Sequence, residues 1–501
     1  MSNCEVVTKS GKVRGKEKDG IFKWLGIPYA EKPLGDLRFR KAVPVVPWSG
    51  VIDATKYAQK PIQGDYLLNI QNKKVGESED CLYLNIMSNG TQEKKPVLVW
   101  IYGGAFIIGE PSIKMYDGTK FVEEGVVFVS INYRLGIYGG FDLSHLDGGN
   151  DKFDDNIFIS DQVQALRWIH ENIEAFGGDP DNVTIMGESA GGTSVINLMA
   201  VPEAKGFFQK VICESGVIGA TVRPKVGNLN MQLMLKHMNI NENEIEKIKE
   251  LKTEQLEEAS VWLLNNYTRI YPGHYLAGPM TGSLLPELPL DAIKKGAGKG
   301  VKLLIGTNQD EATLFVTKKN GNMCSNRDEV EQFLDDIQTP AEIKKKLNKL
   351  YKDYGNKKGI LKFMRDLNFT YHSALAADYQ SQFADTYMYQ YTYAPLMAKI
   401  MKYGCYHTSE IPFVFNTTER YEMKILHKLT TKKTLEYFST VFHFNWLNFI
   451  KYGNPNGKGN APWPKYDIKT KEVYRIDKTC EVLNDPYALM KETLSQLRIY
   501  Q

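Results

Sequence analysis

Short, uncharged apolar runs in the first two hundred residues predict buried strands. One run covers residues 97–102 and stops at a pair of glycines, and a second covers residues 126–131. Residues 183–186 form a third. The first two are rich in β-branched and aromatic residues, as strands covered on both faces are. We therefore expect these segments in the interior of one sheet.

A helical pattern lies between the second and third runs. From residue 161 to 173 the apolar positions fall at intervals of three and four, at Val163, Leu166, Ile169 and Ile173. The glycine-rich segment 177–180 then predicts a break. A strand–helix–strand order of this kind is typical of the α/β class, with a large, mostly parallel central sheet flanked by helices.

The second half of the chain mixes strands with charged helical segments. Residues 241–259 and 328–354 have apolar positions at helical spacing within highly charged sequence. Residues 301–306 predict a further strand, and so does the alternating, tyrosine-rich segment 385–394. The charged segments are interpreted as helical insertions over or beside the sheet.

The chain shows no internal repeat, no low-complexity tract and no Pro/Ser-rich linker. We expect residues 1–501 to form a single domain, with helical, cap-like insertions at about 223–290 and 320–400.

Charge and composition exclude several classes of protein. The 62 Lys and Arg residues nearly balance the 59 Asp and Glu residues, and a net charge of +3 is unlike a nucleic-acid binder. The six cysteines include no close pair typical of a metal or redox site. The opening residues lack the apolar core of a signal peptide, and no run reaches the roughly 18 apolar residues of a membrane span. We expect a cytoplasmic protein, with a monomer favoured.

The candidate chemistry lies directly after the third strand. Gly187-Glu188-Ser189-Ala190-Gly191 matches G-x-S-x-G, and the small residues 190–200 that follow it predict a helix. This strand–turn–helix context is that of the nucleophile elbow of α/β-hydrolases, in which glycines permit a turn where a Cβ would clash. Ser189 is the candidate nucleophile, and the start of the helix favours a developing anion.

A serine nucleophile needs a general base and a carboxylate that orients it, and in α/β-hydrolases these follow in the order serine, acid, histidine. That order leaves four candidate histidines, His372, His407, His427 and His443. His407 lies in a short polar loop and is the first choice, whereas His443 lies in an aromatic helix and is interpreted as a packing residue. Asp310 and Glu311 both follow the strand near residue 305, and sequence physics does not separate them.

The oxyanion of a tetrahedral intermediate also needs backbone N–H donors. The glycines after the first buried strand supply a loop where such folds place them, and the residue after the nucleophile completes the set. We expect the N–H groups of Gly104, Ala105 and Ala190 in this role.

Taken together, the motifs resemble the type-B carboxylesterases, the family that includes cholinesterases and bacterial para-nitrobenzyl esterases. The resemblance covers nearly the whole chain. It rests on a collinear set of segments, Gly26-Ile27-Pro28-Tyr29-Ala30, Leu37-Arg38-Phe39, Glu79-Asp80-Cys81-Leu82-Tyr83-Leu84-Asn85, Gly103-Gly104-Ala105-Phe106, Asn132-Tyr133-Arg134-Leu135-Gly136, Phe176-Gly177-Gly178-Asp179-Pro180, Gly187-Glu188-Ser189-Ala190-Gly191-Gly192, Asn448-Phe449 and Gly453-Asn454-Pro455-Asn456.

The resemblance implies roles that the residues alone leave open. The family's acid is a glutamate in a pattern that matches Glu311, and its histidine pattern matches His407. Ser215 falls where the family has a serine that supports the acid. Independently of the resemblance, we expect Glu188, beside the nucleophile, to add a local negative field. A structural ion pair between Arg38 and Glu79 is also implied.

Two departures from the family narrow the interpretation. Secreted members pair the cysteine equivalent to Cys81 with one a little upstream, but only Cys4 precedes it here, outside that loop, so we expect no disulfide. Cholinesterases carry a tryptophan in the same loop that binds quaternary ammonium. Residues 57–80 contain Tyr57 and Tyr66 but no tryptophan, which disfavours choline esters.

The sequence thus predicts a serine carboxylesterase that hydrolyses short- to medium-chain, uncharged esters through an acyl-serine, with a small-molecule ester as its partner and no metal or organic cofactor. The alternative is a non-catalytic, cholinesterase-like binding module, or a protein that captures esters or organophosphates stoichiometrically.

Overall fold

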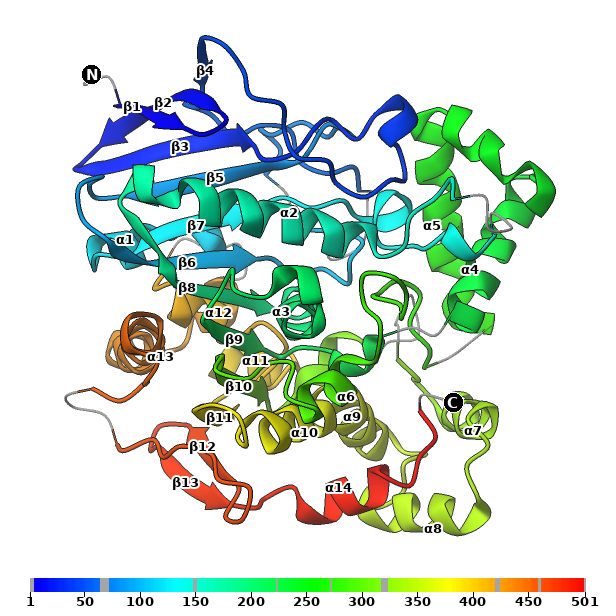
Figure 1. Cartoon of the computed structure of the whole chain (residues 1–501). Coiled ribbons are helices and arrows are strands. Elements are labelled where there is room, and N and C mark those ends of the chain that lie inside the picture. The colour runs from blue at the N-terminus through cyan, green and yellow to red at the C-terminus, as the bar shows by residue number, and fades with distance from the viewer. Residues whose placement is uncertain are drawn as a thin grey trace.

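The computed structural model describes residues 4–63, 72–146, 151–221, 224–270, 273–316, 323–419, 424–457 and 461–499. One large sheet forms its centre (Figure 1). Its strands are β1 Cys4–Thr8, β2 Gly11–Lys18, β3 Ile21–Pro28, β4 Val51–Asp53, β5 Tyr83–Ser88, β6 Lys95–Ile101, β7 Val127–Ile131, β8 Gly178–Glu188, β9 Lys210–Glu214, β10 Lys302–Asn308, β11 Thr386–Tyr391, β12 Glu472–Ile476 and β13 Glu481–Asn484.

The sheet is antiparallel at its two edges and parallel in its centre. Its order is β1-β2-β3-β5-β7-β6-β8-β9-β10-β11-β12-β13, and β4 pairs with β2. From β7 to β12 every neighbouring pair is parallel. The strands of this central part end at the same edge, so the loops that follow β8, β9 and β10 meet there. The fold is that of a large, mostly parallel α/β protein.

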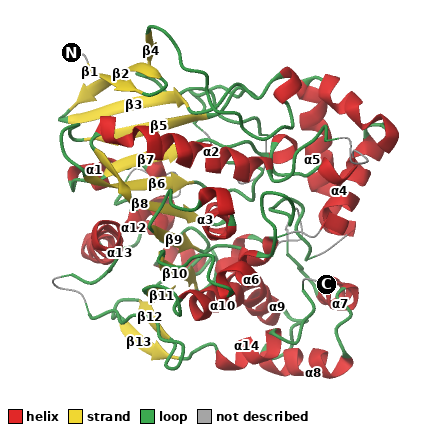
Figure 2. Cartoon of the chain, viewed as in Figure 1, coloured by secondary structure: helices red, strands yellow, loops and turns green. Residues whose placement is uncertain are grey.

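Helices cover both faces of the sheet, with α2 and α3 in front and α12 behind in the view of Figure 1; Figure 2 separates the helical and strand layers by colour. The helices are α1 Thr119–Glu123, α2 Ile157–Asn172, α3 Ala190–Ala200, α4 Pro224–His237, α5 Thr253–Ile270, α6 Pro289–Lys294, α7 Arg327–Asp336, α8 Ala341–Leu350, α9 Lys357–Arg365, α10 Tyr371–Gln380, α11 Leu396–Ile400, α12 Ile411–Val414, α13 Lys432–Tyr452 and α14 Ala488–Leu494.

The predicted charged segments are helical but interrupted. Segment 241–259 divides into a 3-10 stretch, Glu242–Glu250, and the start of α5. Segment 328–354 divides into α7 and α8, because Pro340 lacks an N–H and begins a new helix. In Figure 1 α4, α5, α7 and α8 lie at the right of the molecule, beyond the sheet. The predicted insertion limits at residues 223 and 320 lie outside the described residues, and the single-domain organisation stays a prediction.

Most of the predicted central elements form within one or two residues of their expected limits, including β6, β7, β10 and α3. The helix break expected at residues 177–180 is confirmed: the 3-10 turn after α2 ends at Phe176, Gly177 has a φ of 84°, and β8 begins at Gly178. Gly178 pairs with Lys95, and the register then shifts before Val97. This irregularity accommodates Pro180, which has no N–H for a regular ladder.

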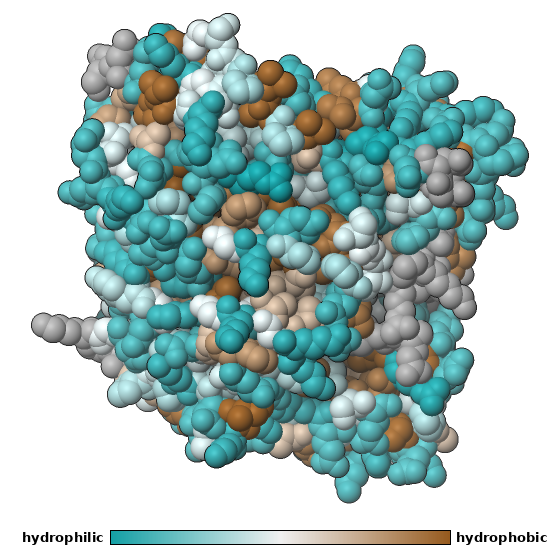
Figure 3. Space-filling model, viewed as in Figure 1, coloured by the Kyte–Doolittle hydropathy of each residue, from teal (hydrophilic) through white to brown (hydrophobic). Residues whose placement is uncertain are grey.

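The interior is built from the two faces of the sheet and the helices against them. Val97, Val99, Val129 and Ile185 have no exposed surface, as their uncharged runs predict. On the face shown in Figure 3, apolar and polar side chains are interspersed. Within the described ranges no helix combines the length and hydropathy needed to cross a bilayer.

Candidate active site

The turn between β8 and α3 consists of Ser189 alone. Its φ of 59° and ψ of −121° lie outside the regions that L residues normally adopt, a conformation that costs about 1–3 kcal/mol. A Cβ at Gly187 would lie 2.3 Å from the carbonyl carbon of Gly191, and one at Gly191 would lie 2.0 Å from a backbone oxygen of β6. The glycines are therefore required by close backbone approach. Ser189 is partly exposed, whereas Glu188 and Ala190 are buried.

Strand register places a second serine beside Ser189. Glu188 at the end of β8 pairs with Glu214 at the end of β9, which in turn pairs with Gly306 of β10. Ser189 N–H donates to Glu214 O, and Ser215 N–H donates to Gly306 O, both over 2.9 Å. The two serines therefore leave neighbouring strands at the same level. Ser215 also has a positive φ, 48°.

The acid and histidine loops are held together by backbone pairing. Asp310 and Tyr406 form a parallel bridge, in which Asp310 N–H donates to Cys405 O over 2.9 Å. The Asp310 carboxylate accepts from Cys405 N–H over 2.8 Å, so it stabilises the loop. Glu311 follows Asp310 in one loop, and His407 follows Tyr406 in the other. His407 Nδ1 donates to Glu311 Oε2 over 2.6 Å. Of the two candidate acids, the structure brings Glu311 to the imidazole.

The other carboxylate oxygen of Glu311 is fixed by two donors. Ser215 Oγ donates to Oε1 over 2.5 Å, and Asn308 N–H donates to it over 2.6 Å. Glu311 has no exposed surface. One oxygen is thus available to His407 while the other is held in place, an arrangement that fixes the orientation and tautomer of the ring.

Glu188 approaches the opposite side of the same ring. Its Oε1 lies 3.0 Å from His407 Nε2, but the two atoms are not aligned as a hydrogen bond. Within the described residues Ser189 Oγ makes no hydrogen bond to His407. Burial opposes a charge on the ring, but Glu188 and then Glu311 outweigh it and raise the pKa of His407 well above its ordinary value. The ring therefore lies between two carboxylates, with Glu311 at Nδ1 and Glu188, the residue directly before Ser189, at Nε2.

The loop that follows β6 lies against the elbow. Gly104 and Ala105 follow β6 with φ values of 118° and 54°, and a Cβ on the preceding Gly103 would lie 2.9 Å from the Cβ of Ser189. In the part of the chain that the structure describes, the N–H groups of Gly104, Ala105 and Ala190 donate to no other protein group. Three uncommitted donors close to a serine suit an anion.

Two further carboxyl groups lie behind the triad candidates, and sequence reasoning missed their burial. Glu410 Oε1 lies 3.2 Å from Ser215 Oγ, and its Oε2 accepts from Asn308 Nδ2. Burial, with the charges of Glu311 and Glu188, raises the pKa of Glu410 to about 8. The single hydrogen of Ser215 Oγ can donate to only one of the two carboxyl groups at a time, and the shorter contact is the one with Glu311.

Glu214 is the second of these groups. Its Oε1 accepts from Trp446 Nε1 of α13 over 2.7 Å, while its Oε2 has no hydrogen-bond partner among the described residues. Burial and the nearby Glu410 raise the pKa of Glu214 well above its usual range. In the sequence, the position of Glu214 directly after the apolar run 211–213 is the feature that could have indicated its burial.

We predict that the Glu410 proton makes stability depend on pH. The folded protein holds a proton up to about pH 8 that the unfolded chain releases near pH 4.3. The stabilisation is complete below the lower value and is lost as pH rises through the upper one, on the order of a few kcal/mol. Glu410→Gln, which stays neutral, should flatten the fall in unfolding free energy between about pH 5 and 8.

Urea titrations across this pH range, with the exposed Glu419→Gln as the matched control, test this prediction. A variant whose stability declines with pH as steeply as that of the wild type would contradict it.

The remaining candidate histidines lie away from the elbow. His443 Nδ1 lies 2.8 Å from the backbone oxygen of Val414, as a packing residue should. His372 and His427 are buried, and desolvation lowers the pKa of each to about 4. None of the three contacts Glu311 among the interactions of the described residues.

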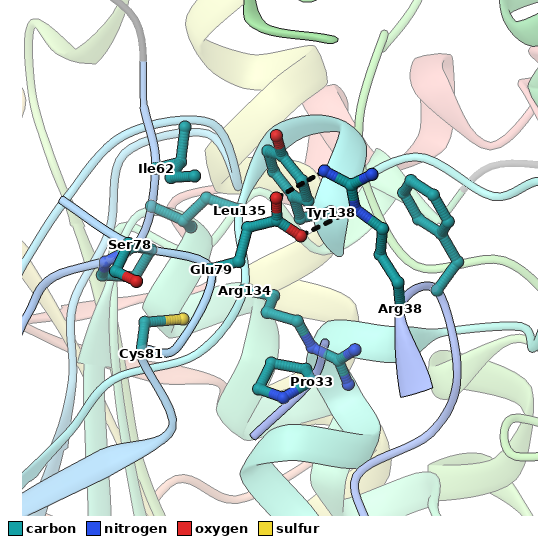
Figure 4. Close-up of a pocket in the computed structure, with 11 residues that line it drawn as sticks. Pro33, Arg38, Ile62, Ser78, Glu79, Cys81, Arg134, Leu135 and Tyr138 are labelled. Atoms are coloured by element: carbon teal, nitrogen blue, oxygen red, sulfur yellow. Dashed lines mark hydrogen bonds and ion pairs between the residues drawn. The ribbon is translucent and has the colours of Figure 1, made fainter. Parts of the chain in front are cut away.

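The ion pair implied by the family resemblance forms at a separate place (Figure 4). Arg38 Nε donates to Glu79 Oε2 over 2.7 Å, and the same guanidinium donates to the backbone oxygens of Lys249 and Leu251 over 2.9 and 2.7 Å. It therefore joins the N-terminal region to the segment before α5. The small hollow beside it includes Cys81 and none of the residues proposed for chemistry. No disulfide joins any two of the six cysteines, all of which lie in the described residues.

Comparison with known proteins adds an independent line of evidence. Residues 2–494 match the model of the carboxylesterase family. The chain belongs to the carboxylesterase family. It is 35% identical over 497 residues to the para-nitrobenzyl esterase of Bacillus subtilis (strain 168), covering 99% of each chain. It is 32% identical to the pyrethroid hydrolase Ces2e of Rattus norvegicus, covering 92% of this chain and 84% of that protein.

Solved structures of the family have the same fold. A thermophilic para-nitrobenzyl esterase superposes with a TM-score of 0.88 at 33% identity, covering 98% of this chain and 100% of the other. The α/β-hydrolase fold is therefore shown. As a member of the carboxylesterase family, the chain is a carboxylic-ester hydrolase.

Proposed function

We propose that the chain is a serine esterase in which Ser189, His407 and Glu311 form the catalytic triad. The observation that carries the proposal is the contact of Glu311 with His407 Nδ1, while the opposite nitrogen lies 3.0 Å from Glu188, the residue directly before the strained turn at Ser189. A buried carboxylate, an imidazole and a partly exposed serine hydroxyl are the groups that acyl transfer requires.

In this mechanism Ser189 Oγ attacks the ester carbonyl carbon, and its proton passes to Nε2 of neutral His407. Glu311 holds the ring through Nδ1–H and stabilises the imidazolium. The carbonyl oxygen becomes an oxyanion that accepts from the N–H groups of Gly104, Ala105 and Ala190. The imidazolium then protonates the leaving alcohol, and water activated by the same ring releases the acid from Ser189.

Ser215 and Glu188 are proposed to support the triad. Ser215 Oγ donates to the oxygen of Glu311 that does not contact the ring, so it fixes the carboxylate. Glu188 adds a second negative charge 3.0 Å from Nε2, so it stabilises the imidazolium formed during acylation.

We propose that the substrates are uncharged esters with short to medium acyl chains. The rings of Phe315 and Phe369 lie 5.0 and 5.1 Å from the His407 ring, so the surroundings of the reacting group are partly apolar. The carboxylates of Glu188 and Glu311 disfavour an anionic acyl group nearby.

Hydrolysis of para-nitrophenyl acetate, butyrate and octanoate tests this proposal. The proposal predicts steady turnover, with acetate and butyrate used well and an anionic para-nitrophenyl succinate used much less than the butyrate. A burst of one equivalent that then stops would show stoichiometric capture. No reaction with any ester by folded protein would overturn the proposal in favour of a binding module.

The acid limb of the pH–rate profile provides a second test. His407 must be neutral to accept the Ser189 proton, and the charge of Glu188 raises the pKa of His407. In Glu188→Gln the pKa of His407 should fall, and the acid limb of kcat/KM should move to lower pH. The exposed Glu203→Gln is the control. An acid limb that stays in place or moves to higher pH would contradict the proposed field of Glu188.

A further inference from the structure

Two neighbouring segments carry an exposed apolar face. Helix α11 and the turn Lys424–His427 pack on each other through the fully buried side chains of Ala398 and Leu426. Outside this contact five large apolar side chains are between 44% and 59% exposed, Leu396, Ile400, Met401, Ile425 and Leu429. They are five of the sixteen large apolar side chains that are exposed among the described residues. Single exposed apolar residues are ordinary, but a cluster of five indicates a contact surface.

The same segments are strongly basic. Residues 395–403 and 424–433 contain six lysines and no Asp or Glu. All six lysines are exposed, Lys399, Lys402, Lys424, Lys428, Lys432 and Lys433. Among the described residues only Lys432 forms an ion pair, with Glu436 over 3.6 Å. Because the whole chain carries only +3, this excess is local. We call the eleven side chains the basic apolar face.

We propose that the basic apolar face docks on the surface of an anionic phospholipid bilayer. Aliphatic and thioether side chains enter the boundary between headgroups and acyl chains, while lysines extend their ammonium groups to the phosphates. Each lysine near an anionic surface contributes an attraction that salt weakens. The five exposed apolar side chains and the six exposed lysines of these segments supply the two components.

The composition of the basic apolar face disfavours two other possible occupants, a second copy of the chain and a different protein. A second copy of the chain in a two-fold dimer would place six lysines against the same six lysines. A protein partner is less well matched, because the centres of protein interfaces are depleted in lysine and anchored by Trp, Tyr and Arg. None of these three residues is among the eleven side chains of the face.

The face lies beside the proposed catalytic loops. Tyr406 is buried in the same small cluster as Ala398 and Leu426, and Leu314 packs against it. Tyr406 precedes His407, and Leu314 lies in the 3-10 turn that begins at Glu311. In the view of Figure 1 α11 lies behind the sheet. Docking is tested by measuring binding to vesicles and not ester hydrolysis. The outcome of that test therefore does not depend on the proposed function.

Sedimentation with vesicles tests the proposal. The full-length protein should bind vesicles that contain phosphatidylglycerol more tightly than vesicles of phosphatidylcholine alone, and added salt should weaken this binding. Lys402→Gln with Lys428→Gln should weaken binding to the anionic vesicles roughly 30-fold. Ile400→Asp with Ile425→Asp should weaken it at least about tenfold.

The matched control is Val46→Asp with Leu489→Asp, because both positions are exposed apolar sites elsewhere on the molecule. It should bind like the wild type, and every variant should keep its thermal stability and its hydrolysis of a soluble ester. The proposal is overturned if the wild type does not bind anionic vesicles at low salt, or if the isoleucine variant binds as well as the control. A lipid-free dimer that the isoleucine variant abolishes would also overturn it, in favour of self-association.

Discussion

Ser189→Ala should lower kcat for para-nitrophenyl butyrate by about 10⁵–10⁶-fold, the loss expected when the nucleophile of a triad is removed. The reason is specific to the elbow. Ser189 is the one residue between β8 and α3, so its replacement leaves no hydroxyl at the end of the strand. The residual rate should not follow the titration of His407, because the ring then has no proton to accept from residue 189.

The strain at the elbow gives this prediction a second measurable part. At φ 59° and ψ −121° glycine is tolerated much better than alanine. Ser189→Gly should therefore be as inactive as Ser189→Ala, but its free energy of unfolding should be higher by about 1 kcal/mol. This difference is smaller than the full backbone strain, because glycine also makes the unfolded chain more flexible. Denaturant titration of both variants measures the difference. Activity of either variant within about tenfold of the wild type would contradict the role of Ser189.

Glu311→Gln should lower kcat by about 10⁴-fold, as expected when the triad acid becomes an amide. The hydrogen bonds dictate the orientation of the new side chain. Ser215 Oγ–H and Asn308 N–H both donate to the same oxygen of Glu311, so the amide oxygen stays there and the NH₂ group points to His407. Nδ1 must then accept, the ring proton moves to Nε2, and the lone pair that should take the Ser189 proton is lost.

Asp310→Asn is the matched control for this change. Asp310 accepts from the backbone N–H of Cys405, a bond that the amide oxygen of asparagine retains, so kcat should change by less than about tenfold. Steady-state kinetics of both variants, with thermal unfolding to confirm folding, separate the two carboxyl groups. Equal losses in the two variants would show that the acid loop acts only through its structure.

Much of this fold is predictable from local sequence. Uncharged runs such as residues 97–102 identify the buried strands, and the glycines around Ser189 identify the elbow, because both depend on short-range sterics and burial. The preference for Glu311 over Asp310 came from the family resemblance. The physical reason for it lies in the bridge between Asp310 and Tyr406, a pairing of loops almost a hundred residues apart that no local pattern encodes.

The buried acid groups show the same limit. Glu188 and Glu214 become neighbours through strand register, and Glu410 becomes buried through the packing of its loop on β10. Local sequence shows each as a glutamate near an apolar run. Their proximity, and hence the raised pKa of Glu410, is a consequence of tertiary structure.

Covalent labelling tests the central claim most directly. The protein is treated with one equivalent of an uncharged aryl fluorophosphonate, digested, and mapped by mass spectrometry while residual ester hydrolysis is followed. The proposed mechanism predicts one phosphonyl group on Ser189 and a loss of activity in proportion to the label, with no labelling of Ser189→Ala. Label on another residue, or full activity in protein labelled completely on Ser189, would contradict it.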